Sequence, residues 1–332
     1  MDLVIGGSGF IGSHLVDLLK AAGNPVRVFD RKPWPEGLPR PDEAVQGDIR
    51  DARAVRKAAQ GCKRIFHLAA NPMLWDRCPK VFDQVNRQGT ENVIRAAIEA
   101  KVRRLVYTST ESILTPRDHQ GPITEDVRVT EEDQLGPYCL SKYRAERAVL
   151  DLAASGFDAV VVNPTMPLGP GDRNLTPPGR MVRNFLQGKI KAYIDCRLNF
   201  VDVRDAALGH LLAAERGVAG RRYILAGHNL SVKELLTLAA REAGMRPPAF
   251  RVPFGLALAF SHAEEWWGRR TGREPMSSVT GVKLCRRSMA FDGSRTWREL
   301  GGSSGFRIRP LAETVRETLL WHLHELGKTA TV

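Results

Sequence analysis

Two tyrosines in the segment GPYCLSKYRAER (136–147) are each followed, four residues later, by a cation. Tyr138 precedes Lys142, and Tyr143 precedes Arg147. Four residues make about one helical turn, so either pair can meet on a helix surface. A nearby cation lowers the pKa of a phenol, which helps a tyrosine to exchange a proton with a substrate hydroxyl near neutral pH. Both pairs have the residue types for acid–base chemistry, and their surroundings must decide between them.

A glycine-rich turn, VIGGSGFIG (4–12), follows the first apolar run and opens the first helical segment. Gly6 or Gly7, together with Gly9 and Gly12, allows a tight turn in which backbone N–H groups at a helix N-terminus approach a pyrophosphate. A glycine pattern alone is weak evidence. Its position between a strand and a helix favours a dinucleotide site over a glycine turn without a ligand.

An acidic residue, Asp30, ends the second predicted strand. A carboxylate there can accept hydrogen bonds from the adenosine ribose and repels a 2′-phosphate, which favours NAD. Arg31 and Lys32 follow at once and can instead hold that phosphate, so NADP stays open. Asp48 follows the third predicted strand, where it can meet the adenine amino group or cap the next helix.

Short apolar runs alternate with helical stretches through the first half of the chain. We expect strands at 3–5, 26–29, 44–47, 64–70, 104–109 and 158–163, with helices over 10–22, 51–60, 80–100 and from about 138. Strands this apolar are buried on both faces, as in a parallel sheet flanked by helices. The order predicts an α/β protein with a Rossmann-type, doubly wound parallel sheet and a smaller, mostly helical C-terminal substrate lobe.

After Asn163 the chain becomes rich in Pro and Gly over 164–180 and then mainly helical. Further strands are predicted at 199–203 and 221–227, which return the chain to the main sheet, and helices near 231–243, 254–270, 292–299 and 310–325. We therefore predict a nucleotide-binding domain of residues 1–163 plus about 199–227. The substrate lobe comprises residues 164–198 plus about 228–330.

Composition narrows the classes of protein. The 332 residues are 43% apolar and 26% charged, which is ordinary for a globular protein. No apolar run approaches the ~20 residues of a membrane span. The five cysteines are scattered without CxxC spacing, which argues against a disulfide framework or a metal site and favours the reducing cytoplasm. We expect the apolar segment 254–267 to pack within the lobe; a substrate pocket or a membrane surface are the alternatives.

The net charge of +12 is unevenly distributed. Residues 1–162 carry 23 Lys and Arg against 22 Asp and Glu, whereas residues 163–332 carry 26 against 15. A pocket for a phosphorylated ligand, an anionic membrane surface and a merely solvated basic surface all fit this excess. Nucleic acid fits least, because the arginines are dispersed and no basic tail, zinc finger or RNP-like segment is present.

Several short motifs occur in a recognisable order. GGSGFIG, GDIRD, HLAA, NRQGT, YTST, YCLSK and NPT follow one another along the chain. In that order they resemble the extended short-chain dehydrogenase/reductase family. The resemblance covers essentially the whole chain, and its motifs are highly specific. It selects Tyr138 and Lys142 as the reactive pair and leaves Tyr143 and Arg147 on the helix surface.

The resemblance implies a role for each matching residue. Tyr138 becomes the catalytic acid/base, Lys142 lowers its pKa and binds the nicotinamide ribose, and Thr110 binds the substrate oxygen. Asn86 supports the site without reacting. We expect the NAD contacts to come from Gly6, Gly9, Phe10, Ile11, Gly12, Asp30, Arg31, Asp48, Ile49, Leu68, Ala69, Ala70, Thr108, Tyr138, Lys142, Pro164, Thr165 and Met166.

Substrate contacts are expected from Ser109, Glu111, Asn163 and Arg180. Glu111 departs from the small residue that is common after the catalytic Ser or Thr in this family. Dehydratases of the family carry an Asp-Glu pair in this region, where the present chain has Glu111 and Ser112. The difference disfavours dehydration.

The second half, from residue 163 to 217 and again at 223–236 and 271–275, resembles the branch called hopanoid-associated sugar epimerases. Plant dihydroflavonol reductases and 3β-hydroxysteroid dehydrogenases are more distant relatives. The branch implies epimerisation of a nucleotide sugar, in which a hydride passes to bound NAD and returns to the other face of the sugar. Arg180 is the candidate contact for the diphosphate, or else a surface arginine beside a proline loop.

Two other functions remain open. One is a carbonyl reductase or alcohol dehydrogenase that acts on an apolar substrate, such as a polycyclic or lipid-linked alcohol. The other is an NAD-binding regulatory protein without chemistry, against which the intact set of Thr110, Tyr138 and Lys142 argues. Relatives dimerise through a four-helix bundle, so the helices at 80–100 and 138–155 predict a homodimer by analogy.

Overall fold

Seven parallel strands form the central sheet of the computed structural model, which describes residues 1–287, 289–302 and 306–327. Their order across the sheet is β10-β6-β5-β4-β1-β2-β3. The chain fills one side of β1 with β2 and β3 and then crosses over to place β4, β5, β6 and β10 on the other. The predicted doubly wound Rossmann-type sheet is therefore confirmed. Its strands are β1 (Asp2–Ile5), β2 (Val26–Asp30), β3 (Glu43–Gln46), β4 (Arg64–His67), β5 (Arg104–Thr108), β6 (Ala159–Pro164) and β10 (Arg222–Leu225).

Burial along the strands follows their place in the sheet. Every residue of β1 and β6 is buried, because helices cover both faces there. Every residue of β3 is exposed, in contrast to the burial expected from its apolar sequence. The reason is its position at the sheet edge, where it pairs only with β2.

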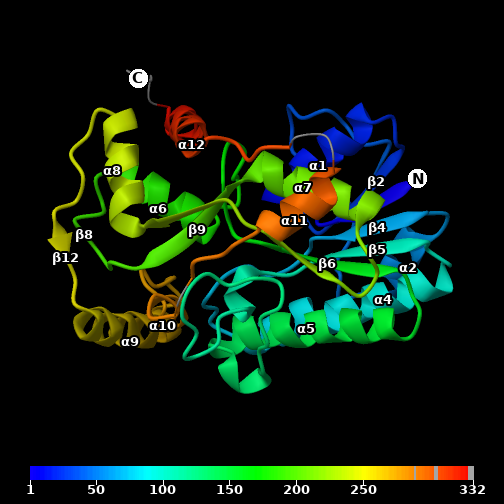
Figure 1. Cartoon of the computed structure of the whole chain (residues 1–332), viewed down its shortest axis with the longest axis horizontal. Helices are drawn as coiled ribbons and strands as arrows, with labels where there is room; N and C mark the ends of the chain where they lie inside the picture. The colour runs from blue at the N-terminus through cyan, green and yellow to red at the C-terminus, as the bar shows by residue number, and fades with distance from the viewer. Residues whose placement is uncertain (288, 303–305, 328–332) are drawn as a thin grey trace.

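Helices cover both faces of the sheet (Figure 1). On one face α2 (Ala52–Ala59), α4 (Gly89–Glu99) and α5 (Gly136–Ala154) share an apolar core with β1 and β5. On the other face α1 (Phe10–Ala21), α7 (Val203–Arg216) and α11 (Ser294–Gly301) pack on β1, β2 and β6. A short helix α3 (Lys80–Phe82) continues through the π-helical turn η1 (Asp83–Gln88) into α4.

The second half returns to the sheet only in part. β10 joins it, but β9 (Arg197–Asp202) pairs with β7 (Met166–Leu168) and β11 (His228–Ser231) in a separate small sheet. The helix predicted near 292–299 forms as α11, yet it packs on α7 and β10 rather than within the lobe. Of the predicted lobe, residues 288, 303–305 and 328–330 lie outside the described parts of the chain.

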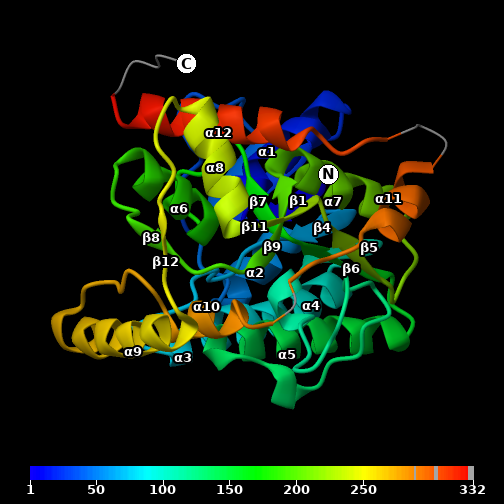
Figure 2. The ribbon, with the colours of Figure 1, turned by 60° about the vertical axis from the view of Figure 1, so that its left-hand side comes forward.

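The C-terminal lobe is mostly helical, as expected (Figure 2). A two-stranded sheet of β8 (Ala192–Tyr193) and β12 (Phe250–Arg251) accompanies its helices. A single apolar core runs from the lobe to the base of α5, so the lobe and the carboxyl ends of β5 and β6 enclose a common region. In the parts of the chain described here, no helix combines the length and apolarity needed to cross a bilayer. The lobe helices are α6 (Pro177–Leu186), α8 (Val232–Glu242), α9 (Phe254–Thr271), α10 (Val279–Leu284) and α12 (Leu311–Glu325).

Candidate active site

The glycine turn between β1 and α1 is shaped by close backbone contacts. Gly6 has a φ of +89°, and a Cβ there would lie 2.5 Å from the backbone nitrogen of Ala69. A Cβ on Gly12 would lie 2.3 Å from the carbonyl oxygen of Gly6. Only glycine fits at either position. Because α1 begins after Gly9, which has no side chain to cap the helix, the N–H groups of its first turn fit the pyrophosphate of a dinucleotide.

Asp30 lies beside this turn at the carboxyl end of β2. Its Oδ2 accepts a hydrogen bond from the backbone N–H of Ser8 at 3.0 Å, and its Oδ1 accepts one from the N–H of Lys32 at 2.9 Å. Burial raises the pKa of Asp30, and these backbone hydrogen bonds oppose the rise. A carboxylate oxygen accepts more than one hydrogen bond, so the position fits a ribose hydroxyl. The Lys32 ammonium is bonded to Asn174, and the Arg31 carbonyl accepts from Gln46.

Two acidic residues after β3, Asp48 and Asp51, have different roles. Asp51 caps α2, where its Oδ1 accepts from the N–H groups of Arg53 and Ala54 at 2.9 and 3.1 Å. Asp48 instead forms an ion pair with Arg50 at 2.7 Å. Its interpretation as a helix cap is therefore wrong, whereas its contact with adenine stays a prediction.

Two further segments expected at the cofactor lie at the same edge of the sheet. After β4, the N–H groups of Leu68 and Ala69 both donate to the carbonyl of Ile5, at 2.8 and 2.9 Å, which holds this segment against the glycine turn. After β6, the N–H and hydroxyl of Thr165 both donate to the carbonyl of Leu225. The expected cofactor set is completed by flanking positions in these regions, by the start of α1 and by the loop after β3: Phe10, Ile11, Ile49, Ala70, Pro164 and Met166.

Tyr138, in the first turn of α5, lies close to the end of β5. Thr110 follows that strand, and its hydroxyl donates to Oε2 of Glu111 at 2.9 Å and lies 2.9 Å from Oγ of Ser112. Burial raises the pKa of Tyr138, the Glu111 carboxylate raises it further, and hydrogen bonds with Thr110 and Ser112 oppose the rise. Burial also raises the pKa of Glu111 to about 7. The structure thus brings Tyr138, Thr110 and Glu111 together.

The Lys142 ammonium is held by groups other than Tyr138. It donates to Oη of Tyr107 at 2.8 Å and to the carbonyl oxygen of Thr108 at 2.7 Å. Burial lowers the pKa of Lys142 to about 7, and Glu146 opposes this effect. The expected lowering of the Tyr138 pKa by Lys142 is absent from the protein alone, where the pKa of Tyr138 is raised. An ammonium has three donors, so one is left for a ribose hydroxyl.

Behind Lys142 lies a buried polar chain that sequence reasoning missed. Nε2 of His67 is 2.9 Å from Oγ1 of Thr90, and Thr90 also hydrogen-bonds Tyr107. Burial lowers the pKa of His67 to about 3, so the imidazole is neutral at pH 7. Since the Thr90 hydroxyl donates to the carbonyl of Asn86 at 2.6 Å, Nε2 of His67 carries the donated hydrogen. The motifs HLAA and NRQGT contain His67 and Thr90, but only the fold brings them to Lys142.

Glu146 and Asn163 form a second buried group. Nδ2 of Asn163 donates to the Thr110 carbonyl at 3.1 Å and to Oε2 of Glu146 at 2.9 Å. The other Glu146 oxygen accepts from Nε of Arg222 at 2.9 Å. Asn163 therefore holds the backbone of Thr110 through its Nδ2, and its expected contact with substrate stays a prediction. The spacing of Glu146, one turn beyond Lys142, is the signal that could have identified it.

Three other residues were expected to contact cofactor or substrate: Thr108, Ser109 and Arg180. Thr108 and Arg180 have partners within the protein, and Ser109 is buried. Oγ1 of Thr108 is 2.8 Å from Nε2 of His210. Ser109 is buried, and its hydroxyl lacks a hydrogen-bond partner among the described residues. Arg180 on α6 forms an ion pair with Glu274 at 2.5 Å, so its guanidinium is already engaged.

Asn86 lies in a supporting position, as the sequence led us to expect. Its Oδ1 accepts from the N–H of Asn71 at 2.8 Å, and its Nδ2 donates to Oγ of Ser141 at 3.0 Å. These two bonds tie η1 and the loop after β4 to α5. They keep α5 in register with the strand ends.

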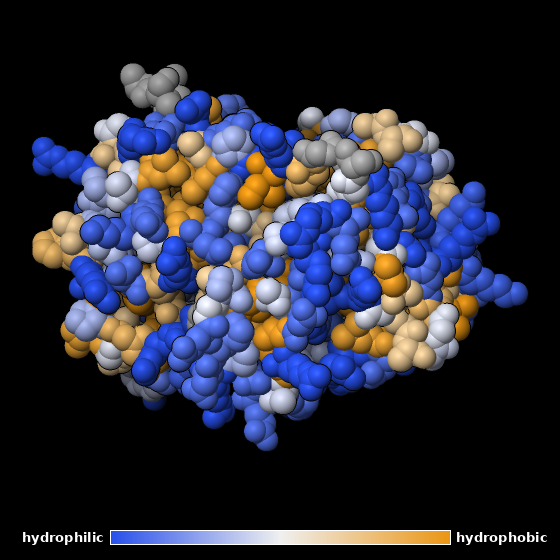
Figure 3. Space-filling view, viewed as in Figure 1, coloured by the Kyte–Doolittle hydropathy of each residue, from blue (hydrophilic) through white to orange (hydrophobic). Residues whose placement is uncertain are grey.

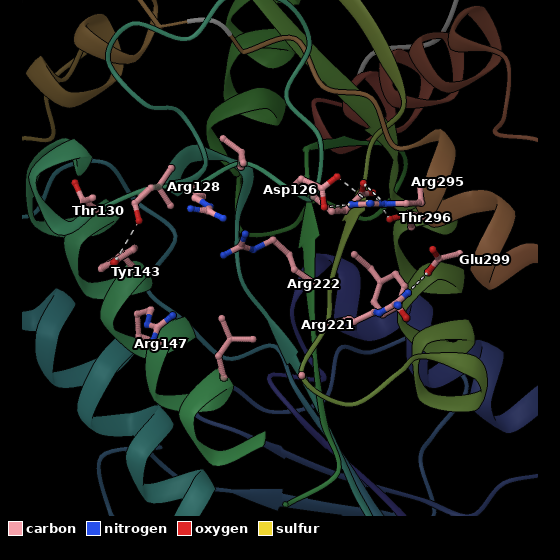
Figure 4. A pocket seen from close by; sticks show the side chains of 16 residues that line it. Asp126, Arg128, Thr130, Tyr143, Arg147, Arg221, Arg222, Arg295, Thr296 and Glu299 are labelled. Carbon is pink, nitrogen blue, oxygen red and sulfur yellow. Dashed lines mark hydrogen bonds and ion pairs between the residues drawn. The ribbon is translucent and has the colours of Figure 1, made fainter. Parts of the chain in front are cut away.

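The second tyrosine–cation pair lies on another face of α5 (Figure 4). The Tyr143 hydroxyl donates to the Val129 carbonyl at 3.4 Å, and Arg147 donates to Asp151 at 3.1 Å. Both line a cavity of about 780 Å³ whose lining contains none of the residues Thr110, Tyr138 and Lys142. The two pairs therefore face different environments.

Comparison with known proteins agrees with this geometry. The model of the NAD dependent epimerase/dehydratase family matches residues 3–226. A putative dihydroflavonol 4-reductase of Synechocystis sp. is 36% identical over 318 residues, which are 94% of this chain and 92% of the relative. Sterol demethylase protein B of Methylococcus capsulatus is 31% identical, over 90% of this chain and 92% of that protein.

Solved structures give the same picture. The crystal structure of gox2253 superimposes with a TM-score of 0.84 and 33% identity, covering 99% of both chains. MoeE5, in complex with UDP-glucose and NAD, superimposes with a TM-score of 0.76 and 26% identity, covering 98% of this chain and 99% of MoeE5. Since the family model spans most of the chain and the relatives cover nearly all of it, the chain belongs to the NAD-dependent epimerase/dehydratase family of extended short-chain dehydrogenases/reductases and is an NAD-dependent enzyme.

Proposed function

We propose that the chain is a carbonyl reductase or alcohol dehydrogenase that acts on an apolar hydroxy or keto compound. The observation that carries the proposal is the apolar wall around Tyr138. Its ring packs edge-on to Phe82 at a centroid distance of 6.2 Å, and half-buried apolar side chains such as Met73 and Met166 pack against the same core. An apolar ring system gains free energy by covering such a surface, whereas a sugar hydroxyl loses hydrogen bonds to water there.

The residue assigned to a sugar diphosphate supports the same choice. Arg180 is paired with Glu274 through Nη1, so a diphosphate there would meet the neighbouring carboxylate as well as the guanidinium. The names of the curated relatives reported above, a putative reductase and a protein named for a sterol, favour apolar substrates as well. Epimerisation of a nucleotide sugar keeps support from MoeE5, which was solved with UDP-glucose but is less similar to this chain.

In this proposal Tyr138 exchanges a proton with the substrate oxygen. Because burial raises its pKa, Tyr138 carries its proton in the protein alone, which suits donation to a carbonyl oxygen in the direction of reduction. Thr110 orients that oxygen, and Asn163 fixes the backbone of Thr110. Lys142, positioned by Tyr107 and Thr108, offers its remaining donor to the cofactor ribose. NAD, bound at the glycine turn and Asp30, supplies the redox chemistry by giving or taking the hydride.

A substrate panel tests the proposal. Steroid ketones, dihydroflavonols and UDP-sugars are each added to the full-length chain with NADH, and cofactor absorbance is followed while the products are analysed. We expect stoichiometric oxidation of NADH with apolar ketones and none with UDP-sugars. Inversion of a UDP-sugar without net change in NADH would overturn the proposal in favour of epimerisation. Cofactor binding without turnover of any compound would favour the regulatory protein instead.

Arg180→Ala supplies a second and independent measurement. Under the proposal the KM for the apolar ketone stays within about twofold of the wild-type value, since Arg180 does not contact that substrate and a surface ion pair contributes little to stability. A large rise in KM confined to a UDP-sugar would contradict it. Titration with both nucleotides measures the cofactor preference, and the carboxylate of Asp30 favours NAD over NADP.

Assembly and location complete the proposal. We infer a homodimer formed through α4 and α5, which lie side by side on one face of the sheet (Figure 1). Analytical ultracentrifugation measures this, and a monomer at micromolar concentration would contradict it. All five cysteines are free thiols, which supports a reducing compartment such as the cytoplasm.

A further inference from the structure

Helix α9 turns its apolar side chains toward solvent. Leu256, Phe260, Trp266 and Trp267 are 66%, 49%, 55% and 53% exposed. Leu256, Phe260 and Trp267 lie four and seven residues apart, so they form one stripe along the helix, with Trp266 beside it. The sequence analysis expected this segment to pack within the lobe, and for the outward face of α9 that expectation is wrong.

The two glutamates of α9 bond to backbone groups of the segment that follows the helix. Oε2 of Glu264 accepts from the N–H of Met276 at 2.9 Å, and Oε1 of Glu265 accepts from the N–H of Val279 at 2.7 Å. The buried residues of the helix are only Ala257, Ser261 and Gly268. A surface helix of a globular protein normally buries its apolar stripe, so α9 departs from this pattern by exposing its large apolar side chains.

Two further exposed apolar residues lie near α9 in the sequence. Phe250, 72% exposed, precedes the helix on β12, and Met276, 70% exposed, follows it and donates its backbone N–H to Glu264. α9 forms an outer edge of the lobe (Figure 2), and the space-filling view shows hydrophobic and hydrophilic residues side by side over this corner (Figure 3). We call the set Phe250, Leu256, Phe260, Trp266, Trp267 and Met276 the α9 patch.

Basic residues lie beside the α9 patch at the C-terminal end of the helix. Residues 245–287 contain eight Lys and Arg against three Glu. Glu264 and Glu265 accept from backbone N–H groups, Glu265 also pairs with Arg269 at 3.7 Å, and Glu274 is paired with Arg180. Arg269, Arg270 and Arg273 are exposed at the C-terminal end of the helix. The guanidinium of Arg270 lies 4.5 Å from the ring centroid of Trp266, so cation and aromatic ring share one surface.

We propose that the α9 patch docks the chain onto an anionic phospholipid surface, with α9 lying in the plane of the interface. Tryptophan and arginine are favoured at the headgroup level, and exposed phenylalanine and leucine gain free energy by entering the acyl boundary. Anionic headgroups match the basic rim. A second copy of the chain fits less well, because symmetric pairing of α9 would bring the arginines of both copies together.

The attachment is peripheral and needs only the lobe surface. The attachment does not rest on the proposed reaction. It fits a reductase that acts on an apolar alcohol and equally an epimerase that acts on a lipid-linked sugar, because both substrates are available at a membrane. Vesicle binding is therefore measured separately from activity, and failure of one leaves the other standing.

Vesicle sedimentation of the full chain is the test. Phosphatidylglycerol/phosphatidylcholine vesicles are compared with pure phosphatidylcholine vesicles at low and high salt. We expect the protein to sediment with the anionic vesicles, to be released by salt, and to show a blue shift of tryptophan fluorescence on binding. Equal partitioning into neutral vesicles, or none into anionic ones, would overturn the proposal.

Variants locate the contact. Phe260→Ser with Trp267→Ser, and separately Arg269→Gln with Arg270→Gln, should each lower partitioning about tenfold or more. The matched control is Val218→Ser, which removes a side chain that is 51% exposed outside the α9 patch and should change nothing. All three proteins should unfold at the wild-type temperature, since the altered side chains are exposed. The proposal would be contradicted if both double variants bound vesicles as well as the wild type does. It would also be contradicted if they lost a dimer instead of vesicle binding.

Discussion

The two faces of α5 carry the same sequence spacing and different environments. On one face Tyr138, Lys142 and Glu146 are 8%, 3% and 1% exposed and are surrounded by Thr110, Glu111, Asn163 and Tyr107. On the other face Tyr143 is half-buried beside an open cavity, and Arg147 is exposed and paired with Asp151. A tyrosine four residues before a cation is therefore not chemistry by itself. Burial at the end of the sheet distinguishes the first pair, because burial shifts pKa values and fixes the partners of each group.

Removing one tyrosine hydroxyl from each face of α5 tests the difference between the two faces most directly. Tyr138→Phe should lower kcat by about 10³, since a positioned acid/base contributes roughly 10² to 10⁴, while NAD affinity stays within about twofold. Tyr143→Phe is the matched control and should retain wild-type turnover, because its hydroxyl contacts only a backbone carbonyl. Steady-state kinetics with a substrate identified in the panel measures both. Turnover by Tyr138→Phe near the wild-type rate would end the assignment.

Stability should show the same asymmetry one turn further along the helix. Glu146→Gln leaves the largely buried guanidinium of Arg222 without its counter-charge, which costs about 3 kcal/mol of unfolding free energy. Asp151→Asn removes an exposed partner of Arg147 and should cost less than about 0.5 kcal/mol. Urea denaturation of the three proteins gives the values. Equal losses for the two variants would mean that burial does not distinguish the faces.

The pH dependence of stability should report the carboxyl group that faces Tyr138. Burial raises the pKa of Glu111 from 4.5 to about 7, so the folded chain keeps a proton that the unfolded chain loses. Stability from this group is present below pH 4.5 and falls as the pH rises to about 7, by up to about 3 kcal/mol. Lys142 acts in the opposite direction. Its pKa falls from 10.5 to about 7, so its contribution to stability rises as the pH increases from about 7 to 10.5.

Glu111→Gln should therefore flatten the stability curve between pH 4.5 and 7, as measured by denaturation at several pH values. Glu132→Gln is the matched control, because Glu132 is exposed on the 3₁₀ turn that precedes α5. It should leave the curve unchanged. A Glu111→Gln curve that keeps the wild-type slope would place the titration elsewhere.

The smallest expected difference concerns the two cations. Lys142→Met should lower kcat/KM about 100-fold and weaken NAD binding, because it removes the donor left for the ribose; comparable losses follow when a positioned electrostatic group is deleted. Arg147→Met should change neither by more than about twofold. Steady-state kinetics and nucleotide titration give both numbers. Normal NAD affinity in Lys142→Met would show that this ammonium acts only through Tyr107.

Much of the fold was predictable from local pattern. The glycine turn, six strands of the sheet and the helix that begins near Tyr138 follow from apolar runs, turn residues and periodicity. The destinations of β9 and α11 were not predictable, because strand pairing and helix docking depend on contacts between distant segments. The exposure of α9 was missed for the same reason. Periodicity shows that a helix has an apolar stripe, but not whether another element covers it.

The sequence by itself determined the type of chemistry: a dinucleotide turn, an acidic strand end and a Tyr-x-x-x-Lys pair, each encoded within a few adjacent residues. Only the tertiary structure decided what surrounds that pair. His67, Thr90 and Tyr107 reach Lys142 from separate elements, and Asn163 and Arg222 reach Glu146 from neighbouring strands. These contacts join residues that are far apart in the chain, so the pKa shifts of His67 and Lys142 exist only after folding has removed water from around them.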